Sequence, residues 1–362
     1  MMKYSTPSAP TRSARQTRQL ALALTLQATL LLAACGGGGG SDSTTSTPTA
    51  TPTPVPVATP TPTPTPVGNA SGTAFAPIDT SNRAEVIARY QDSFLPLQQT
   101  AFSWTGNVGS CLAGDTPLAY KNAEVRLLNY YRAMAGESGN VTLSLPLAAK
   151  AQQAALMMDA NSALNHSPPT SWTCYTADGA TAAGSSNLAL GSPTLNSGIG
   201  GPGLYIKDSG VSSLGHRRWV LYSRLAIVGP GDTPRANALW VLGNDGPAVT
   251  LANGVAWPPA GYVPVDSHIA DPAMQWSFSY PGADFSAATV TVQDDAGNPV
   301  ALTGVGQLPN GYGDNTLSWS LSTSASGWSR LPADTKLSVS IANVMIGGSA
   351  RSFSYTVTFV QP

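Results

Sequence analysis

The chain has 362 residues, a formal net charge of −1 and only 10% charged residues, against roughly 25% in a typical soluble domain. Its 18 Lys and Arg are balanced by 19 Asp and Glu. This balance argues against an intracellular nucleic-acid-binding protein, because neutralising phosphates requires clustered Lys and Arg. Only three of the acids are Glu, namely Glu85, Glu124 and Glu137, and no Glu follows residue 137.

Residues 1–34 have the pattern of a secretory signal peptide. The first 18 residues carry one Lys, three Arg and no acid, and the apolar stretch at 20–32 is too short to be a convincing membrane span. The stretch ends on Leu32-Ala33-Ala34-Cys35, which resembles the lipobox of bacterial lipoproteins. We therefore expect lipid on Cys35 and cleavage before it.

Cleavage before Cys35 would leave 328 residues with a net charge of −5, because four basic residues are removed with the signal. An attached lipid would make the membrane a partner of the protein and would place the protein in the cell envelope. Gly36, instead of Asp, after the lipidated Cys favours onward sorting to an outer membrane or the cell surface.

Export also bears on the cysteines, because an oxidising compartment favours disulfides. If Cys35 is consumed by lipid, Cys111 and Cys174 form the only internal pair. The loop that this disulfide would close contributes roughly 4 kcal/mol in the chain-entropy model. The alternative is two buried free thiols.

Residues 35–73 form a tether rich in Gly, Ser, Thr and Pro that contains almost nothing to bury. Its Gly run is flexible, and its Thr-Pro repeats predict a polyproline II spacer of about 3.1 Å per residue. Whether the Thr residues are O-glycosylated stays open.

A helical lead-in is expected at residues 74–116, with an amphipathic helix at about 83–97. The first domain then spans 117–245. It opens with a helix after Pro117 and continues with a helix after Pro146 whose small residues suggest close packing. Short helices at 204–208 and 213–222 and strands at 225–228 and 238–242 follow. Helices first and strands later indicate an α+β domain.

Residues 246–273 are expected to connect this domain to a second one. The Trp257-Pro258-Pro259 segment should be a rigid apolar contact between the domains, and His268 should fix the junction. From residue 274 to 362 the pattern changes to a period of two. Five alternating stretches separated by turns predict a small all-β sandwich of immunoglobulin-like type, whose aromatic residues are core residues by default.

The first domain contains five short motifs in a recognisable order. They are Asn129-x-x-Arg132, Ala151-x-x-x-Ala155-x-x-Met158, Asn165-His166-Ser167, Asn187-Leu188-Ala189-x-Gly191 and Gly215-His216-Arg217. This order resembles the CAP superfamily of cysteine-rich secretory proteins, antigen five and plant pathogenesis-related protein one. The resemblance covers about residues 117–245. It implies an α-β-α sandwich with a cleft that holds two His and two Glu and often binds Zn.

Carried over residue by residue, the two cleft histidines fall on His166 and His216, and the loop glutamate before Asn187 falls on Ser186. Because no Glu follows residue 137, neither cleft glutamate is present. Two imidazoles alone make a weak Zn site, so no cofactor is expected. Asp208 is a candidate oxygen ligand and Asp178 is a weaker one.

Each of these residues also has a plain structural interpretation. The histidines could hydrogen-bond to the loop backbone, and Asp208 could face Lys207, Arg217 or Arg218. Asn187 is expected to pin its loop, and Asn129 and Arg132 to brace the fold.

We therefore predict a lipid-anchored envelope protein that binds a hydrophobic small molecule, a glycan or a surface partner without catalysis. The alternative is a metal-dependent or serine-type hydrolase, with Ser186 as nucleophile, His166 or His216 as base and Asp208 as orienting group. The residues around Ser186 do not form a G-x-S-x-G elbow, which counts against it. A third interpretation makes the first domain an inert scaffold and the sandwich an adhesin.

Overall fold

The computed structural model describes residues 72–191, 200–249, 252–266, 269, 274–322 and 334–362. The predicted signal peptide, Cys35, the tether up to residue 71 and His268 lie outside the described residues. Within them, no helix combines the length and the apolar character needed to cross a membrane.

The helix expected at 83–97 is present as three consecutive segments, α1 (Arg83–Arg89), the π-helical η1 (Tyr90–Phe94) and α2 (Leu95–Gln98). Asn82 begins it by accepting hydrogen bonds from two backbone amides of the first turn. The π-helical turn comes directly before Pro96, which has no N–H and whose ring crowds the carbonyl four residues earlier.

Helix α3 (Leu118–Met134) follows Pro117, and the apolar side chains of Leu127, Tyr130, Tyr131 and Met134, spaced i, i+3, i+4 and i+7 along it, are buried. Helix α4 (Leu145–Asn161) is the predicted helix around Pro146. Its small residues allow the close packing that the sequence suggests. A Cβ on Gly231 of the neighbouring strand would lie 2.1 Å from the backbone nitrogen of Gln152.

Four strands form the sheet of the first domain, in the order β1-β3-β4-β2. They are β1 (Thr142–Leu143), β2 (Ser186–Leu190), β3 (Ile227–Asp232) and β4 (Ala236–Trp240). Three short helices complete the domain, α5 (Ala177–Ser185), α6 (Gly200–Lys207) and α7 (Gly215–Val220). The Ala- and Gly-rich α5 has no helical apolar period and was not predicted.

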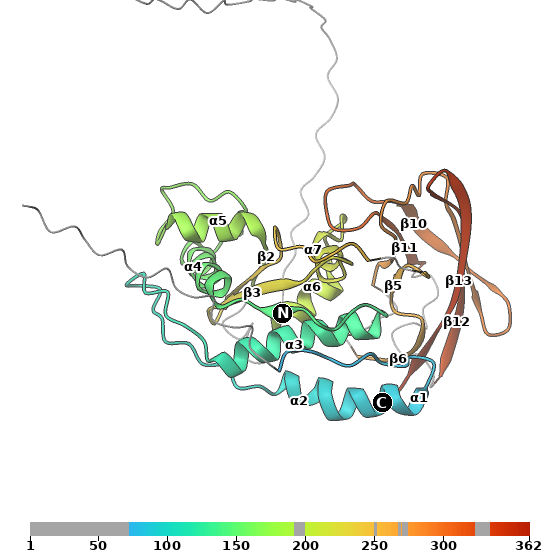
Figure 1. Ribbon diagram of the computed structural model, residues 1–362, viewed down its shortest axis with the longest axis horizontal. Coiled ribbons are helices and arrows are strands. Elements are labelled where there is room, and N and C mark those ends of the chain that lie inside the picture. Colours follow the sequence, from blue (N-terminus) through green and yellow to red (C-terminus); the bar gives the residue numbers. More distant parts are fainter. Residues whose placement is uncertain (1–71, 192–199, 250–251, 267–268, 270–273, 323–333) are drawn as a thin grey trace, which may run out of the picture. The chain divides into compact units, whose positions relative to one another are not determined.

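Helices cover both faces of this sheet (Figure 1). Along β2, Leu188 joins a small apolar cluster with α4 and α5, whereas Ala189 belongs to the large core that includes α3 and α6. Along β4, Ala238 and Leu239 divide between the two clusters in the same way. Because neighbouring residues of a strand point to opposite faces, this division defines an α-β-α sandwich.

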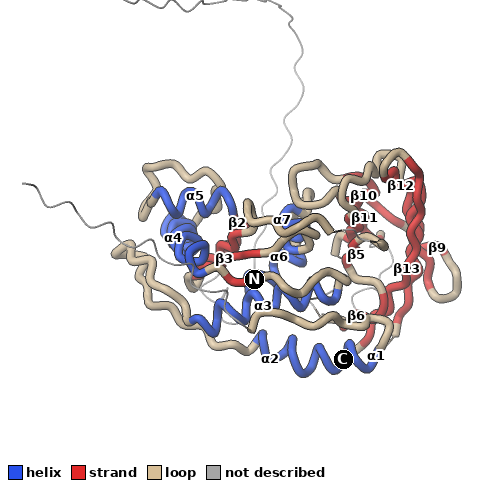
Figure 2. Tube along the Cα trace, in the orientation of Figure 1, coloured by secondary structure: helices blue, strands red, loops and turns tan. Residues whose placement is uncertain are grey.

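The C-terminal part is all β, with strands in two sheets (Figure 2). The first sheet has the order β10-β11-β7-β5 and the second the order β6-β13-β12-β8-β9. The strands are β5 (Val255–Trp257), β6 (Gly261–Pro264), β7 (Trp276–Ser279), β8 (Thr289–Asp294), β9 (Pro299–Val300), β10 (Leu302–Gln307), β11 (Thr316–Leu321), β12 (Thr335–Ile346) and β13 (Ser349–Val360). Trp276 and Trp319 are fully buried in this part, as expected of sandwich aromatics.

Residues 246–273, expected as a connector, contain two of these strands. β5 pairs with β7 in one sheet, and β6 pairs in parallel with β13 in the other. Trp257, the last residue of β5, also makes the expected contact with the first domain. The buried ring of Trp257 meets Tyr131 of α3 edge-on, with 5.9 Å between the ring centroids.

Candidate functional site

Asn129 and Arg132 of α3 brace the fold, as expected from their motif. The Asn129 side chain donates to the carbonyls of Thr73 and Val141 and accepts from the Val141 amide. Arg132 donates to the carbonyls of Ser138, Val220 and Tyr222. Both side chains are therefore committed to connecting loops and are not available for chemistry.

His216 lies in the first turn of α7 and is held by Asp208, which follows the end of α6. The ring Nδ1 lies 2.7 Å from the carboxylate Oδ1 of Asp208, and the other carboxylate oxygen accepts from the Arg217 amide at 3.1 Å. Asp208 is buried and, among the described residues, makes no direct ion pair with Lys207, Arg217 or Arg218. Because a carboxylate only accepts, Nδ1 carries the proton and Nε2 is left for a ligand.

His166 lies in the loop after α4 and is oriented by backbone. Its Nδ1 lies 2.8 Å from the carbonyl oxygen of Ala183 in α5. A carbonyl also only accepts, so Nε2 is again the free ring nitrogen. No hydrogen bond to Nε2 of either histidine is present among the described residues.

The two histidines line one cavity of about 310 Å³, which we call the cleft. Ser186 and Asn187, at the start of β2, line it as well. Apolar side chains complete its walls, namely Val211, Trp219, Val241 and Leu242. Asp208 lies behind His216 and lines a smaller adjoining hollow of about 160 Å³.

Ser186 has the most unusual environment in the cleft. Its side chain is buried, at 5% exposure, and its hydroxyl has no hydrogen-bond partner among the described residues. A buried hydroxyl without a partner costs about 1–3 kcal/mol. Because Ser186 lines a cavity, a ligand bound there is a candidate source of the missing hydrogen bond.

Asn187 pins its loop, as the sequence suggests. Its amide donates to the His216 carbonyl at 3.0 Å, and its own carbonyl accepts from the Tyr205 hydroxyl at 3.1 Å. The Tyr205 ring also packs against the His216 ring, with 5.3 Å between centroids. These contacts fix the position of His216 in the cleft.

The donor set does not fit a Zn site. Asp208, the candidate oxygen ligand, is already bonded to His216 Nδ1, and Asp178 is exposed and pairs with Lys150. In the described part of the chain, no three His, Cys, Asp or Glu side chains are grouped so that they could hold a metal ion. Ser186 stands where the resemblance places a glutamate, so the cleft offers two imidazole nitrogens and no carboxylate.

A buried pair of acids beneath the cleft was not foreseen. Asn237 of β4 donates to both Glu124 of α3 and Asp232 of β3, at 3.0 and 2.7 Å. It also accepts from the Tyr205 hydroxyl, which links the pair to Asn187. The signal was available, because Glu124 shares the spacing of buried Leu127, Leu128 and Tyr131 on α3.

Both acids keep a proton to a higher pH than free carboxyl groups do. Burial raises the pKa of Glu124 well above its usual value, and the nearby Asp232 carboxylate raises it further. Burial also raises the pKa of Asp232, to about 6. Two adjacent buried carboxyl groups share one proton more easily than they carry two charges.

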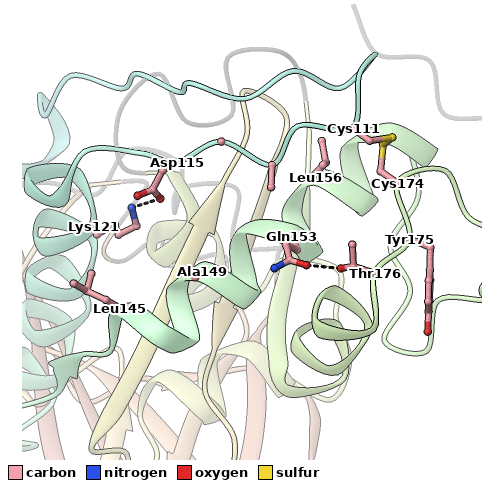
Figure 3. Close-up of a pocket in the computed structure, with 12 residues that line it drawn as sticks. Cys111, Asp115, Lys121, Leu145, Ala149, Gln153, Leu156, Cys174, Tyr175 and Thr176 are labelled. Atoms are coloured by element: carbon pink, nitrogen blue, oxygen red, sulfur yellow. Dashed lines mark hydrogen bonds and ion pairs between the residues drawn. A yellow bond between two sulfur atoms is a disulfide. The ribbon is translucent and has the colours of Figure 1, made fainter. Parts of the chain in front are cut away.

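A larger hollow of about 690 Å³ runs along α4, and we call it the α4 groove (Figure 3). Four of its polar side chains form two hydrogen-bonded pairs. Lys121 donates to Asp115 at 2.5 Å, and Thr176 donates to Gln153 at 2.6 Å. The predicted disulfide between Cys111 and Cys174 closes one end, with 5.1 Å between their Cα atoms.

Fold and cleft together define the class: an α-β-α sandwich whose cleft is lined by two histidines, extended by an all-β region. The model of the CAP family, described as the cysteine-rich secretory protein family, matches residues 125–238. This part of the chain is therefore a CAP-like domain, and the predicted α+β fold class is confirmed.

Two further comparisons add little. A search of curated proteins finds no match. Among solved structures, a DUF4426 family protein from Pseudomonas aeruginosa PAO1 aligns with 26% of this chain and 70% of its own, at 15% identity and a TM-score of 0.18. A TM-score this low does not establish a shared fold.

Proposed function

We propose that the protein is a lipid-anchored component of the cell envelope whose CAP-like domain binds a ligand without transforming it. Support for the anchor is the signal pattern of residues 1–34 followed by Cys35. The test is detergent phase partition. The mature protein should enter the detergent phase, and Cys35→Ala should move it to the aqueous phase; a variant that stays with the detergent contradicts the anchor.

The ligand we propose is a neutral sugar unit of an envelope glycan. The observation that carries this is the free polar set in the cleft: two imidazole Nε2 atoms and the partnerless Ser186 hydroxyl. A purely apolar ligand would leave the buried Ser186 hydroxyl unpaired, which costs about 1–3 kcal/mol, and would remove water from the solvent-accessible imidazoles of His166 and His216. A sugar supplies hydroxyls for them and an apolar face for the wall that Trp219 provides.

Saturation-transfer NMR with chitotriose, cellotriose and maltotriose tests this directly. At least one of the three should bind to the wild-type protein. The double variant His166→Ala/His216→Ala should weaken that binding about tenfold or more, because two ligand hydrogen bonds are lost. Asp178→Ala, an exposed acid outside the cleft, is the matched control and should bind as wild type. Failure of all three sugars to bind would contradict the glycan proposal.

A hydrolase remains the second candidate because of one observation, the 2.7 Å contact that orients His216 on Asp208. Against it, Ser186 hydrogen-bonds to neither imidazole, so nucleophile and base are not joined. Hydrolysis of p-nitrophenyl acetate decides between the two. A catalytic Ser186 predicts turnover that Ser186→Ala and His216→Ala both abolish. Equal background rates in all three proteins would exclude this route.

A further inference from the structure

One wall of the cleft comes from the second domain. The loop between β10 and β11, residues 308–315, places Gly311 and Tyr312 on the same cavity as His216 and Ser186. Tyr312 is 39% exposed, so part of its ring faces solvent at the mouth of the cleft. A large aromatic side chain left partly exposed at a cavity is a common feature of binding sites.

This loop is clamped onto the first domain by charged side chains. Arg218 of α7 donates to the carbonyls of Pro309 at 2.7 Å and Asp314 at 3.1 Å. In return, the Asp314 carboxylate accepts from the amide and the hydroxyl of Ser223. Both charged side chains are buried, at 3% and 7% exposure, so these bonds are shielded from water. The loop is therefore held in one position before any ligand arrives.

Helix α7 is also shaped to admit the Tyr312 ring. The Arg218 guanidinium lies 5.5 Å from the centroid of that ring, within cation–π range. A Cβ on Gly215, the first residue of α7, would lie 2.9 Å from the ring atom Cδ1. Only glycine leaves room for the ring at this point. The position of Tyr312 thus depends on Gly215 and Arg218, which flank His216 in the sequence.

We propose that Tyr312 determines which ligands the cleft admits, and that the two domains form one binding site. This inference rests on the proposed binding function and deepens it. A sugar ring whose hydroxyls meet His166, His216 and Ser186 would lay its apolar face on the phenol ring. The second domain then supplies specificity to the CAP-like cleft, which distinguishes it from an independent adhesin.

The first test needs no ligand. Diethyl pyrocarbonate modifies accessible imidazole nitrogens, and mass spectrometry gives the rate for each histidine. Tyr312→Ala should raise the modification rate of His216 severalfold, because one wall is removed, whereas His166 is already exposed and should change little. Tyr312→Phe keeps the ring and should match wild type. Tyr175→Ala, which removes a phenol from the α4 groove, is the control and should also match.

Unchanged histidine rates in a folded Tyr312→Ala protein would overturn the inference. Thermal unfolding of each variant shows whether it is folded. The modification experiment does not depend on sugar binding. It therefore tests whether Tyr312 forms a wall of the cleft even if the glycan proposal fails.

The second test uses the sugars that bind to wild type. Tyr312→Ala should weaken the best of them by up to about tenfold, since an aromatic contact contributes about 0.5–1.5 kcal/mol. It should also reduce the differences in affinity among the three sugars, whereas Tyr312→Phe preserves them. An unchanged order and strength of binding in Tyr312→Ala would exclude a role in specificity.

Discussion

The cleft and the α4 groove are both lined by polar side chains of the first domain, but these side chains are in opposite states. In the larger groove, the polar side chains Lys121, Asp115, Gln153 and Thr176 are paired with each other. In the smaller cleft, the Ser186 hydroxyl and the Nε2 atoms of both histidines have no partner within the described residues.

This difference separates a structural hollow from a binding site better than volume does. Paired side chains gain nothing from a ligand that must first break their bonds, whereas free buried groups gain a full hydrogen bond. The groove is also closed at one end by a covalent bond, the Cys111–Cys174 disulfide. We therefore expect changes in the groove to alter stability and changes in the cleft to alter binding.

The largest expected effect is the loss of stability when the disulfide at the end of the α4 groove is removed. Replacing both cysteines, Cys111→Ser/Cys174→Ser, should lower the free energy of unfolding by about 4 kcal/mol, because the disulfide closes a loop with a sequence separation of 63. Urea unfolding of the two proteins measures the difference. Sugar binding should persist in the folded variant. Loss of binding with little loss of stability would reverse the roles that we assign to the two hollows.

The next effect concerns the two buried acids, Glu124 and Asp232. The folded-state pKa values of Glu124 and Asp232 lie above those of free carboxyls, so the folded protein binds more protons than the unfolded chain above about pH 4. Stability must therefore fall as the pH rises from about 4 through the raised folded-state pKa values. Glu124→Gln should flatten this dependence and raise stability at pH 7, because the raised pKa of Glu124 no longer contributes to it.

Urea unfolding between pH 4 and 8 provides the measurement, with Asp294→Asn, an exposed turn carboxylate, as control. Glu137 and Asp314 also have raised pKa values and contribute to the pH dependence of stability. The effect of Glu124 is therefore the difference between the pH profiles of Glu124→Gln and the wild type. If stability depends on pH in the same way in Glu124→Gln and in the wild type, the proposal that Glu124 and Asp232 share a proton is contradicted.

Much of the fold was predictable because its signals are local. The apolar spacing of Tyr130 and Tyr131 marks α3, and the period of two marks the later strands. The short strands β5 and β6 escaped prediction because their pairing with β7 and β13 depends on contacts across the sheets. Their own sequences, Val-Ala-Trp in β5 and Gly-Tyr-Val-Pro in β6, are too short to show an alternating pattern.

The site was predictable in part for the same reason. Motifs near His166, His216 and Ser186 identify the residues of the first domain that line the cleft. Tyr312 follows far along the chain in a turn rich in Gly, and only the tertiary structure brings it to His216. Asp208 was considered as a metal ligand, as the partner of a cationic side chain and as the group that orients a histidine, and its contact with the His216 ring agrees with the last of these.

A smaller effect is expected for Lys121, which is 3% exposed and bonds to Asp115 and the Thr116 carbonyl. Lys121→Met should lower the free energy of unfolding by about 2 kcal/mol, because the carbonyl loses its partner in a buried place. Sugar binding should be unchanged. A variant with wild-type stability and weakened binding would make the α4 groove, and not the cleft, the functional site.

The smallest expected effect tests the comparison between the cleft and the α4 groove most directly. Ser186→Ala removes a buried hydroxyl that has no partner, so it should raise the free energy of unfolding by up to about 1 kcal/mol while weakening sugar binding. Thr116→Val is the matched control. It removes another buried, partnerless hydroxyl, beside the α4 groove, and should gain similar stability without affecting binding. Thermal unfolding and sugar titration of both variants provide the measurement. If Ser186→Ala destabilises the protein, its hydroxyl has a structural role, and the strongest reason for placing a ligand in the cleft is lost.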